Sequence, residues 1–223
     1  MLSIKTKNLG AELTSVQYND TEMLFQGSQI LDKENKPFWK RQAPILFPIV
    51  GQLKDGKTKI EENTYEMSQH GFARDMEFKE KFKTENKHHY VLKYNDETLK
   101  KYPYKFELDV IYETTENTLT ITYKVKNIDK NEIYFGLGGH PAFKCDYSNE
   151  EYEIEFNKKE EKIEFLKLKN GLIDTKKAEN ILTDNKIQLK ENTFDNDAII
   201  MKNIKSNKVT LQNHKSNKKI LEF

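Results

Sequence analysis

Regular alternation of apolar and polar residues is the feature that most limits what this chain can fold into. From Leu119 to Lys126 every second residue is apolar, and the residues between them are polar. A period of two is typical of a strand with one buried and one solvated face. Residues 106–113 alternate in a similar way, and the polar stretch 114–117 between the two runs suits a turn. The sequence therefore predicts an antiparallel hairpin over residues 106–126.

Comparable short runs recur along the chain and predict an all-β protein. Turns rich in Asn, Asp, Lys and Gly separate them. Helical spacing is confined to Glu97–Lys101, which Pro103 would end. So many short strands in series favour a large sandwich of antiparallel sheets. The further strands are expected at residues 3–7, 13–18, 64–67, 76–82, 89–94, 133–136, 152–156, 163–168, 198–201, 209–211 and 220–223.

Length and charge restrict the classes of protein to which the chain can belong. Its 223 residues contain no repeat and no Gly/Ser- or Pro-rich linker, so one domain over residues 1–223 is expected. Lys and Arg total 37 against 36 Asp and Glu. This balance argues against a protein that binds nucleic acid or an anionic membrane through clustered cations. An aromatic content of 11% argues against disorder.

The sequence also predicts the cellular location of the protein and excludes an internal disulfide. The first ten residues contain no apolar core of a signal peptide, and no run of 18 apolar residues occurs. A cytoplasmic protein is therefore expected. The single Cys145 excludes an internal disulfide, and we interpret it as structural. Nucleophile-elbow, phosphate-loop and dinucleotide motifs are missing, so no cofactor is expected.

Two segments interrupt the strand pattern and are the places where a site is expected. Residues 37–51 hold three of the five prolines and the only tryptophan. Proline cannot donate to a strand ladder, which makes this an edge or loop segment. Residues 136–143 hold three of the nine glycines beside a histidine. Glycine at that density allows sharp bends and close approach of the backbone to a ligand.

His70 and His140 are the candidate catalytic residues. Both stand next to glycines at irregular strand ends, and an imidazole has an ordinary pKa of about 6.5, which suits proton transfer near neutral pH. The alternative is a packed or surface role without function. The remaining histidines, His88, His89 and His214, lie near lysine-rich turns and are expected to be solvated.

Two arginines lie near these segments. Arg41 follows Trp39, and a planar donor fork beside an aromatic face suits the hydroxyls and apolar face of a sugar. A stacked structural pair is the alternative. Arg74 and Asp75 are adjacent, and their simplest role is to pair with each other.

Asp195 and Asp197 precede a predicted strand, where aspartates often end a turn. A calcium loop is disfavoured there because its glycine and distal glutamate are missing. A transition-metal site of His70, His140 and an aspartate is also disfavoured, because no short-spaced ligand pair occurs.

Four separated motifs resemble the aldose 1-epimerase (galactose mutarotase) family, and most closely its branch of lactose-operon X proteins. The likeness runs from about Leu9 to about Ile200, which is most of the chain. The motifs are Gln42-Ala-Pro-Ile-Leu-Phe-Pro-Ile-Val-Gly51, His70-Gly-Phe-Ala-Arg-Asp75, Glu97-Thr-Leu-Lys-Lys-Tyr-Pro103 and Gly138-Gly-His-Pro-Ala-Phe143.

This resemblance implies a galactose mutarotase-like supersandwich whose concave face holds a monosaccharide. It also implies an isomerase that interconverts the α and β anomers of free aldoses without a cofactor. His140 matches the general acid at the ring oxygen, and His70 matches the histidine that binds and polarises hydroxyls. The balanced charge predicts no nucleic acid and no membrane as partners, and the chain is expected to be a monomer or a dimer.

The resemblance also implies sugar-binding roles for two arginines and one aspartate. Arg41 and Arg74 match residues that position the sugar, and the aspartate that holds a hydroxyl falls at Asp197 or Asp195.

The chain departs from the family at the general base, which is a glutamate near the C-terminus, followed in this branch by Pro and Trp. No Glu-Pro-Trp occurs here, and nothing around Glu222 matches. We expect either a truncated product that lacks the last strands, or a divergent protein that keeps the sugar cleft. A sugar-binding or sensing protein, a sugar-6-phosphate mutarotase and a structural β-domain therefore remain alternatives.

Overall fold

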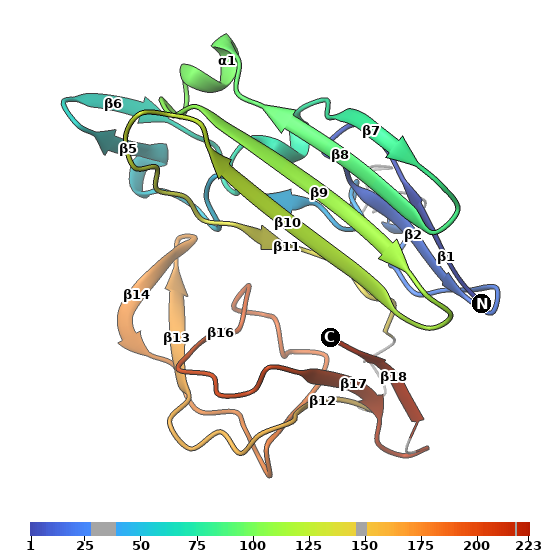
Figure 1. Ribbon diagram of the computed structural model, residues 1–223. Helices are drawn as coiled ribbons and strands as arrows, with labels where there is room; N and C mark the ends of the chain where they lie inside the picture. The colour runs from blue at the N-terminus through green and yellow to red at the C-terminus, as the bar shows by residue number, and fades with distance from the viewer. Residues whose placement is uncertain (28–38, 146–150, 217) are drawn as a thin grey trace, which may run out of the picture. The chain divides into compact units, whose positions relative to one another are not determined.

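A computed structural model describes residues 1–27, 39–145, 151–216 and 218–223 (Figure 1). These residues form two compact units, Met1–Lys144 and Cys145–Phe223, and each is described by itself. Regular structure is almost entirely β-strand, and each named strand pairs antiparallel with its neighbours. The all-β fold predicted from the sequence is confirmed, and the single domain stays a prediction.

The first unit contains a four-stranded sheet in the order β10-β9-β8-β7 and a three-stranded sheet in the order β1-β2-β3. Two short pairs, β5-β6 and β4-β11, complete it. One short helix, α1 (Asp96–Leu99), and two 3₁₀ turns, at Lys54–Gly56 and Ala73–Asp75, lie between strands. The strands are β1 (Leu2–Thr6), β2 (Leu13–Tyr18), β3 (Thr21–Glu22), β4 (Ile45–Leu46), β5 (Lys57–Ile60), β6 (Asn63–Glu66), β7 (Lys79–Lys83), β8 (Lys87–Lys93), β9 (Phe106–Thr114), β10 (Leu119–Asn127) and β11 (Gly138–Gly139).

The predicted hairpin forms as β9 and β10, with Leu119 opposite Thr114 and Asn127 opposite Phe106. Every second side chain of β9 from Phe106 to Tyr112 is buried, as its alternation requires. These side chains join a core that includes Leu13 of β2 and Phe47 of the proline-rich segment. The core therefore draws the irregular segment after β4 against the regular sheet.

The second unit is formed by two sheets, in the orders β15-β12-β17-β18 and β14-β13-β16. Its buried residues include Phe156, Phe165 and Leu211. Glu160, although charged, is buried, because its carboxylate accepts the backbone N–H groups of Lys205 and Ser206. The strands are β12 (Tyr152–Phe156), β13 (Glu164–Lys169), β14 (Leu172–Lys177), β15 (Lys186–Gln188), β16 (Ile200–Lys202), β17 (Val209–Asn213) and β18 (Lys218–Glu222).

Several local predictions were wrong. No strand forms at residues 133–136, and β11 begins only at Gly138, because its partner β4 lies opposite the glycines. Strands β5, β14 and β15 were not predicted, since their charged residues obscure the alternation.

The prediction that three histidines are solvated was also wrong. His88 is 3% exposed, His89 is half-buried with Nε2 2.6 Å from Asp109 Oδ1, and His214 is half-buried. For His88 and His89 the cause is their place within β8, a central strand of the four-stranded sheet.

His88 belongs to a buried polar cluster. Its Nδ1 lies 2.7 Å from Thr6 Oγ1, which also lies 2.7 Å from the hydroxyl of Tyr90. Burial lowers the pKa of His88 below its ordinary value, and the positive charge of Lys83 lowers it further. The folded state therefore holds His88 neutral where an unfolded chain would bind a proton.

Acid is expected to destabilise the first unit through His88. Because the folded pKa lies below the unfolded one, the stabilisation is present above the unfolded pKa of about 6.5 and is lost as pH falls through the folded value. Urea unfolding at pH 7.5 and pH 5 should show a smaller acid loss for His88→Gln than for the unmodified chain. His89→Gln is the control and should not reduce the acid loss. An equal acid loss in the unmodified chain and His88→Gln would contradict this account.

Candidate functional site

The backbone of residues 42–51 is hydrogen-bonded to both histidine motifs. On one side, Ile45 and Leu46 of β4 pair with Gly139 and Gly138, and the His140 N–H donates to the Pro44 carbonyl at 3.1 Å. On the other side, the Phe47 carbonyl accepts the N–H groups of Phe72 and Ala73, at 3.0 and 3.1 Å. Two segments far apart in the sequence are thereby fixed to one short piece of chain.

His70 and His140 lie side by side as a result. Their ring centroids are 5.7 Å apart, with an angle of 63° between the ring planes. Both side chains are half-buried, so neither ring is sealed in the core. The structure therefore brings together the two imidazoles that the sequence singled out.

A backbone hydrogen bond also determines which nitrogen of the neutral His70 ring carries the proton. The N–H of Gly51 donates to Nδ1 of His70 at 3.0 Å, while the N–H of His70 donates to the Gly51 carbonyl at 2.8 Å. An Nδ1 that accepts a hydrogen bond carries no proton, so the neutral ring holds its proton on Nε2. His70 is thus a hydrogen-bond donor through Nε2 in this arrangement.

The turn that presents His70 depends on Gly71. His70 itself has a left-handed backbone, with φ of 68°, and Gly71 has φ of 74°. A Cβ atom at Gly71 would lie 2.2 Å from the Phe47 carbonyl oxygen, well inside contact distance. Only glycine lets this turn approach the backbone at Phe47 closely enough for the hydrogen bonds there.

Trp39 packs beside His140, with ring centroids 5.3 Å apart. The two imidazoles and the indole therefore form a continuous row of rings. From the sequence, Trp39 was considered only together with Arg41, because no local pattern relates it to His140, which lies far along the chain.

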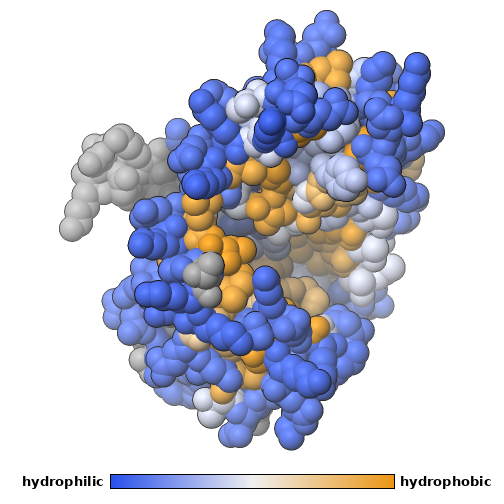
Figure 2. All heavy atoms as spheres, turned by 90° about the vertical axis from the view of Figure 1, so that its left-hand side faces the viewer, coloured by the Kyte–Doolittle hydropathy of each residue, from blue (hydrophilic) through white to orange (hydrophobic). Residues whose placement is uncertain are grey.

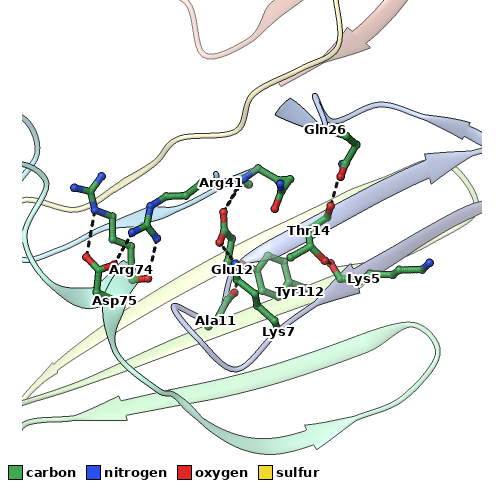
Figure 3. Close-up of polar contacts among 12 residues, drawn as sticks. Lys5, Lys7, Ala11, Glu12, Thr14, Gln26, Arg41, Arg74, Asp75 and Tyr112 are labelled. Atoms are coloured by element: carbon green, nitrogen blue, oxygen red, sulfur yellow. Dashed lines mark hydrogen bonds and ion pairs between the residues drawn. The ribbon is translucent and has the colours of Figure 1, made fainter. Parts of the chain in front are cut away.

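Arg41 and Arg74 converge on Asp75 (Figure 3). Arg41 donates to the Arg74 carbonyl at 3.0 Å and to the carboxylate of Asp75. Arg74 donates to the Gln69 carbonyl at 2.8 Å, directly before His70. Burial and the charge of Arg41 lower the pKa of Arg74, while Asp75 raises it. Arg74 thus braces the His70 turn, and the expected pairing with Asp75 is present.

A buried carboxylate that the sequence analysis missed anchors the same segment. Glu12, 1% exposed, accepts the N–H groups of Gln42 at 2.7 Å and Ala43 at 3.2 Å. Its second oxygen pairs with Lys7 Nζ at 2.6 Å. In Figure 3, Glu12 points toward the backbone that follows Arg41. Nothing marks Glu12 in the sequence, because a lone glutamate before a strand is ordinarily solvated.

Asp195 and Asp197 belong to the second unit and are exposed. They lie in consecutive turns, in which the Asp195 N–H donates to the Asn192 carbonyl and the Asp197 N–H to the Phe194 carbonyl. Their predicted role with a sugar hydroxyl stays a prediction, as do the roles of the four residues in the first unit.

The described residues contain no group of three or more His, Cys, Asp or Glu side chains arranged to hold a metal ion. Within the same residues, no helix has the length and apolar character needed to cross a membrane.

The described residues form an antiparallel β-sheet protein in which two imidazoles lie side by side. The family model for aldose 1-epimerase matches residues 1–222, and the chain belongs to this family. The plasmid-encoded protein LacX of Lactococcus lactis subsp. lactis is 33% identical over 97% of this chain and 75% of its own length.

Solved structures agree with this assignment. A galactose mutarotase related enzyme from Lactobacillus acidophilus is 32% identical, with a TM-score of 0.83 over 96% of this chain and 71% of that one. A galactose mutarotase-like protein from Lactobacillus casei is 31% identical, with a TM-score of 0.82 over 95% and 72%. Family and structural neighbours together support a mutarotase-like sugar isomerase.

Gly71→Ala should destabilise the fold more than Gly51→Ala. Both positions have positive φ, which costs an alanine about 1–2 kcal/mol. Gly51 has open space where a Cβ would lie, whereas Gly71 meets the Phe47 carbonyl. Urea unfolding should show an additional loss of about 1–3 kcal/mol at Gly71. Equal losses would mean that the turn can retreat from Phe47.

Glu12→Ala should lower the free energy of unfolding by about 2–4 kcal/mol, because two buried N–H donors lose their acceptor. Glu12→Gln keeps one acceptor oxygen and should lose less. Glu66→Ala is the matched control, since Glu66 forms an exposed ion pair with Lys57, worth about 0–1 kcal/mol. Equal losses for Glu12→Ala and Glu66→Ala, measured in urea, would remove Glu12 as an anchor.

Proposed function

We propose that this protein interconverts the α and β anomers of a free hexose by general acid–base ring opening. The observation that carries the proposal is the 5.7 Å separation of the His70 and His140 rings on one backbone segment. Family membership supports the same reaction class. The row of Trp39, His140 and His70 adds an apolar aromatic surface that suits one face of a sugar ring.

The reaction requires two coordinated proton transfers. A base removes the proton from the C1 hydroxyl while an acid protonates the ring oxygen, so that the bond between C1 and the ring oxygen breaks and a C1 carbonyl forms. Rotation about the C1–C2 bond and reclosure give the other anomer. We assign the acid to His140 and hydroxyl binding to His70, whose Nε2 is a donor when Nδ1 accepts from Gly51.

His70 is poorly suited to be the base. Its Nδ1 is occupied by the Gly51 N–H, and its Nε2 carries the proton. The family's glutamate before Pro and Trp has no counterpart in this sequence. A second candidate function follows from the donor character of His70 Nε2, which suits hydroxyl binding alone: a monosaccharide-binding or sensing protein on the same scaffold, without turnover.

A neutral sugar is favoured over a sugar phosphate. The guanidinium groups of Arg41 and Arg74 already bind Asp75 and the carbonyls of Arg74 and Gln69. A phosphate would have to compete with the Asp75 carboxylate for the same donors.

The proposal is tested by measuring anomer exchange. Freshly dissolved α-glucose and α-galactose should equilibrate faster with the protein, followed by polarimetry or NMR exchange. His140→Gln should lower the acceleration by roughly 10²–10⁴-fold while the sugar still binds, because a single proton-transfer group contributes that much. His214→Gln, a histidine of the second unit, is the control and should retain the rate.

Two results would contradict the isomerase. Saturable binding of glucose or galactose in calorimetry, with no acceleration, would establish the binding protein instead. Neither binding nor acceleration would leave the structural β-domain. Equal acceleration by His140→Gln and the unmodified chain would remove His140 from the reaction.

A further inference from the structure

The two imidazoles differ in how their ring nitrogens are engaged. His70 accepts the Gly51 N–H at Nδ1, at 3.0 Å, so its neutral ring donates through Nε2. Among the described residues, the ring nitrogens of His140 have no hydrogen-bond partner, and its ring lies against those of Trp39 and His70, with centroids 5.3 and 5.7 Å away. A neutral imidazole carries one N–H and one unprotonated nitrogen. His140 can therefore accept a proton as well as donate one.

The backbone that carries His140 is nevertheless fixed. Gly139 pairs with Ile45 between β11 and β4, and the His140 N–H donates to the Pro44 carbonyl at 3.1 Å. A Cβ atom at Gly139 would lie 3.1 Å from the Tyr123 hydroxyl oxygen, so β10 supports this strand closely. These contacts hold the main chain, while no hydrogen bond from a described residue locks the ring. The ring can therefore tilt between two neighbouring atoms of one ligand.

The reaction offers two such atoms. In a cyclic aldose, the hydroxyl oxygen and the ring oxygen are both bonded to C1, so one group placed beside C1 reaches both of them. In serine hydrolases, one imidazole takes a proton from the nucleophile and later gives it to the leaving group. The same pair of transfers at C1 requires one imidazole and one donor for the oxygen that becomes negatively charged.

We propose that His140 makes both proton transfers, and that the Nε2–H of His70 binds the C1 oxygen while it is negatively charged; we call this the His140 shuttle. Neutral His140 removes the proton from the C1 hydroxyl. The bond between C1 and the ring oxygen then breaks, the C1 carbonyl forms, and His140 gives the same proton to the ring oxygen. Reclosure by the reverse steps leaves His140 neutral again. The inference rests on the proposed function, and it names the base which that function requires.

Apolar side chains near the imidazoles favour the return of the proton to the sugar over its loss to water. Trp39 packs beside His140. Val50, which is 56% exposed, directly precedes Gly51, and its Cγ2 lies 3.3 Å from the place of a Cβ at Gly138. Figure 2 shows hydrophobic residues exposed among hydrophilic ones on the face from which β5 and β6 project. A ligand that covers such side chains displaces water from the reacting atoms.

The contacts of the structure place several titratable or charged groups around His140. The His70 ring cannot take a proton on Nδ1 without losing the Gly51 hydrogen bond. Burial raises the pKa of Tyr123 to about 12, so its hydroxyl is uncharged at pH 9. The charged side chains that meet at the turn after His70 bind one another, and they are Arg41, Arg74 and Asp75. A change of rate between pH 7 and pH 9 is therefore assigned to His140.

The pH profile of anomer exchange tests the His140 shuttle. The acceleration of α-glucose equilibration, after subtraction of the rate without protein, should rise with pH and then stay constant up to pH 9, because the neutral ring starts the reaction. A mechanism in which His140 enters protonated, beside a separate base, gives a rate that falls on the alkaline side. That comparison avoids the acid range in which His88 lowers the stability of the first unit.

Two variants of His70 test its part as a donor. His70→Leu removes the donor and should lower the acceleration roughly 10²–10³-fold, as the loss of one oxyanion donor does. His70→Gln supplies an amide N–H and should retain most of the rate. Both variants should keep the shape of the pH profile, because His140 determines it. Circular dichroism checks that both are folded.

The outcomes separate this inference from the proposed function. Acceleration that falls on the alkaline side overturns the His140 shuttle and leaves the isomerase. A constant alkaline rate that His70→Leu leaves unchanged overturns the assignment of His70 to the C1 oxygen. No acceleration at any pH overturns the shuttle and the proposed function together.

Discussion

The hydrogen bonds that flank residues 42–51 on both sides are the constraint on which the rest of the site depends. The Pro44 and Pro48 carbonyls receive N–H groups from His140 and Gly136, and the Phe47 carbonyl receives those of Phe72 and Ala73. Pro44 and Pro48 have no backbone N–H, so these two residues bind the histidine motifs through their carbonyl groups alone. Phe47 is itself a core residue, so its side chain packs against Phe106 of β9 while its carbonyl holds the turn that presents His70.

Glu12 extends this constraint to the N-terminal sheet. The Tyr112 hydroxyl of β9 donates to the Ala11 carbonyl at 2.8 Å, and the next residue, Glu12, binds the backbone of the segment at Gln42 and Ala43. A buried carboxylate stabilises a fold only when its hydrogen bonds replace those lost from water. The amides of Gln42 and Ala43 donate to one carboxylate oxygen, and the Lys7 ammonium forms an ion pair with the other, so the buried charge is compensated and binds the segment.

The sequence predicted those parts of the fold in which one face is buried and the other wet. Strands β9 and β10 satisfy that condition, whereas β5, Lys-Thr-Lys-Ile, carries lysines that hide its period. His88 was misjudged because neighbouring lysines suggested solvent, while its position inside β8 decided the burial. The glycines beside His70 and His140 marked two imidazoles that the structure places side by side. The contacts of Trp39 and Glu12 depend on tertiary structure, which no local pattern records.

The bond from the Gly51 N–H to Nδ1 of His70 has a consequence for protein engineering. Every residue except proline supplies a main-chain N–H, so this donor survives the replacement of the side chains around it. Protein engineering can therefore vary the side chains around the two imidazoles without changing which nitrogen of the neutral His70 ring bears the hydrogen.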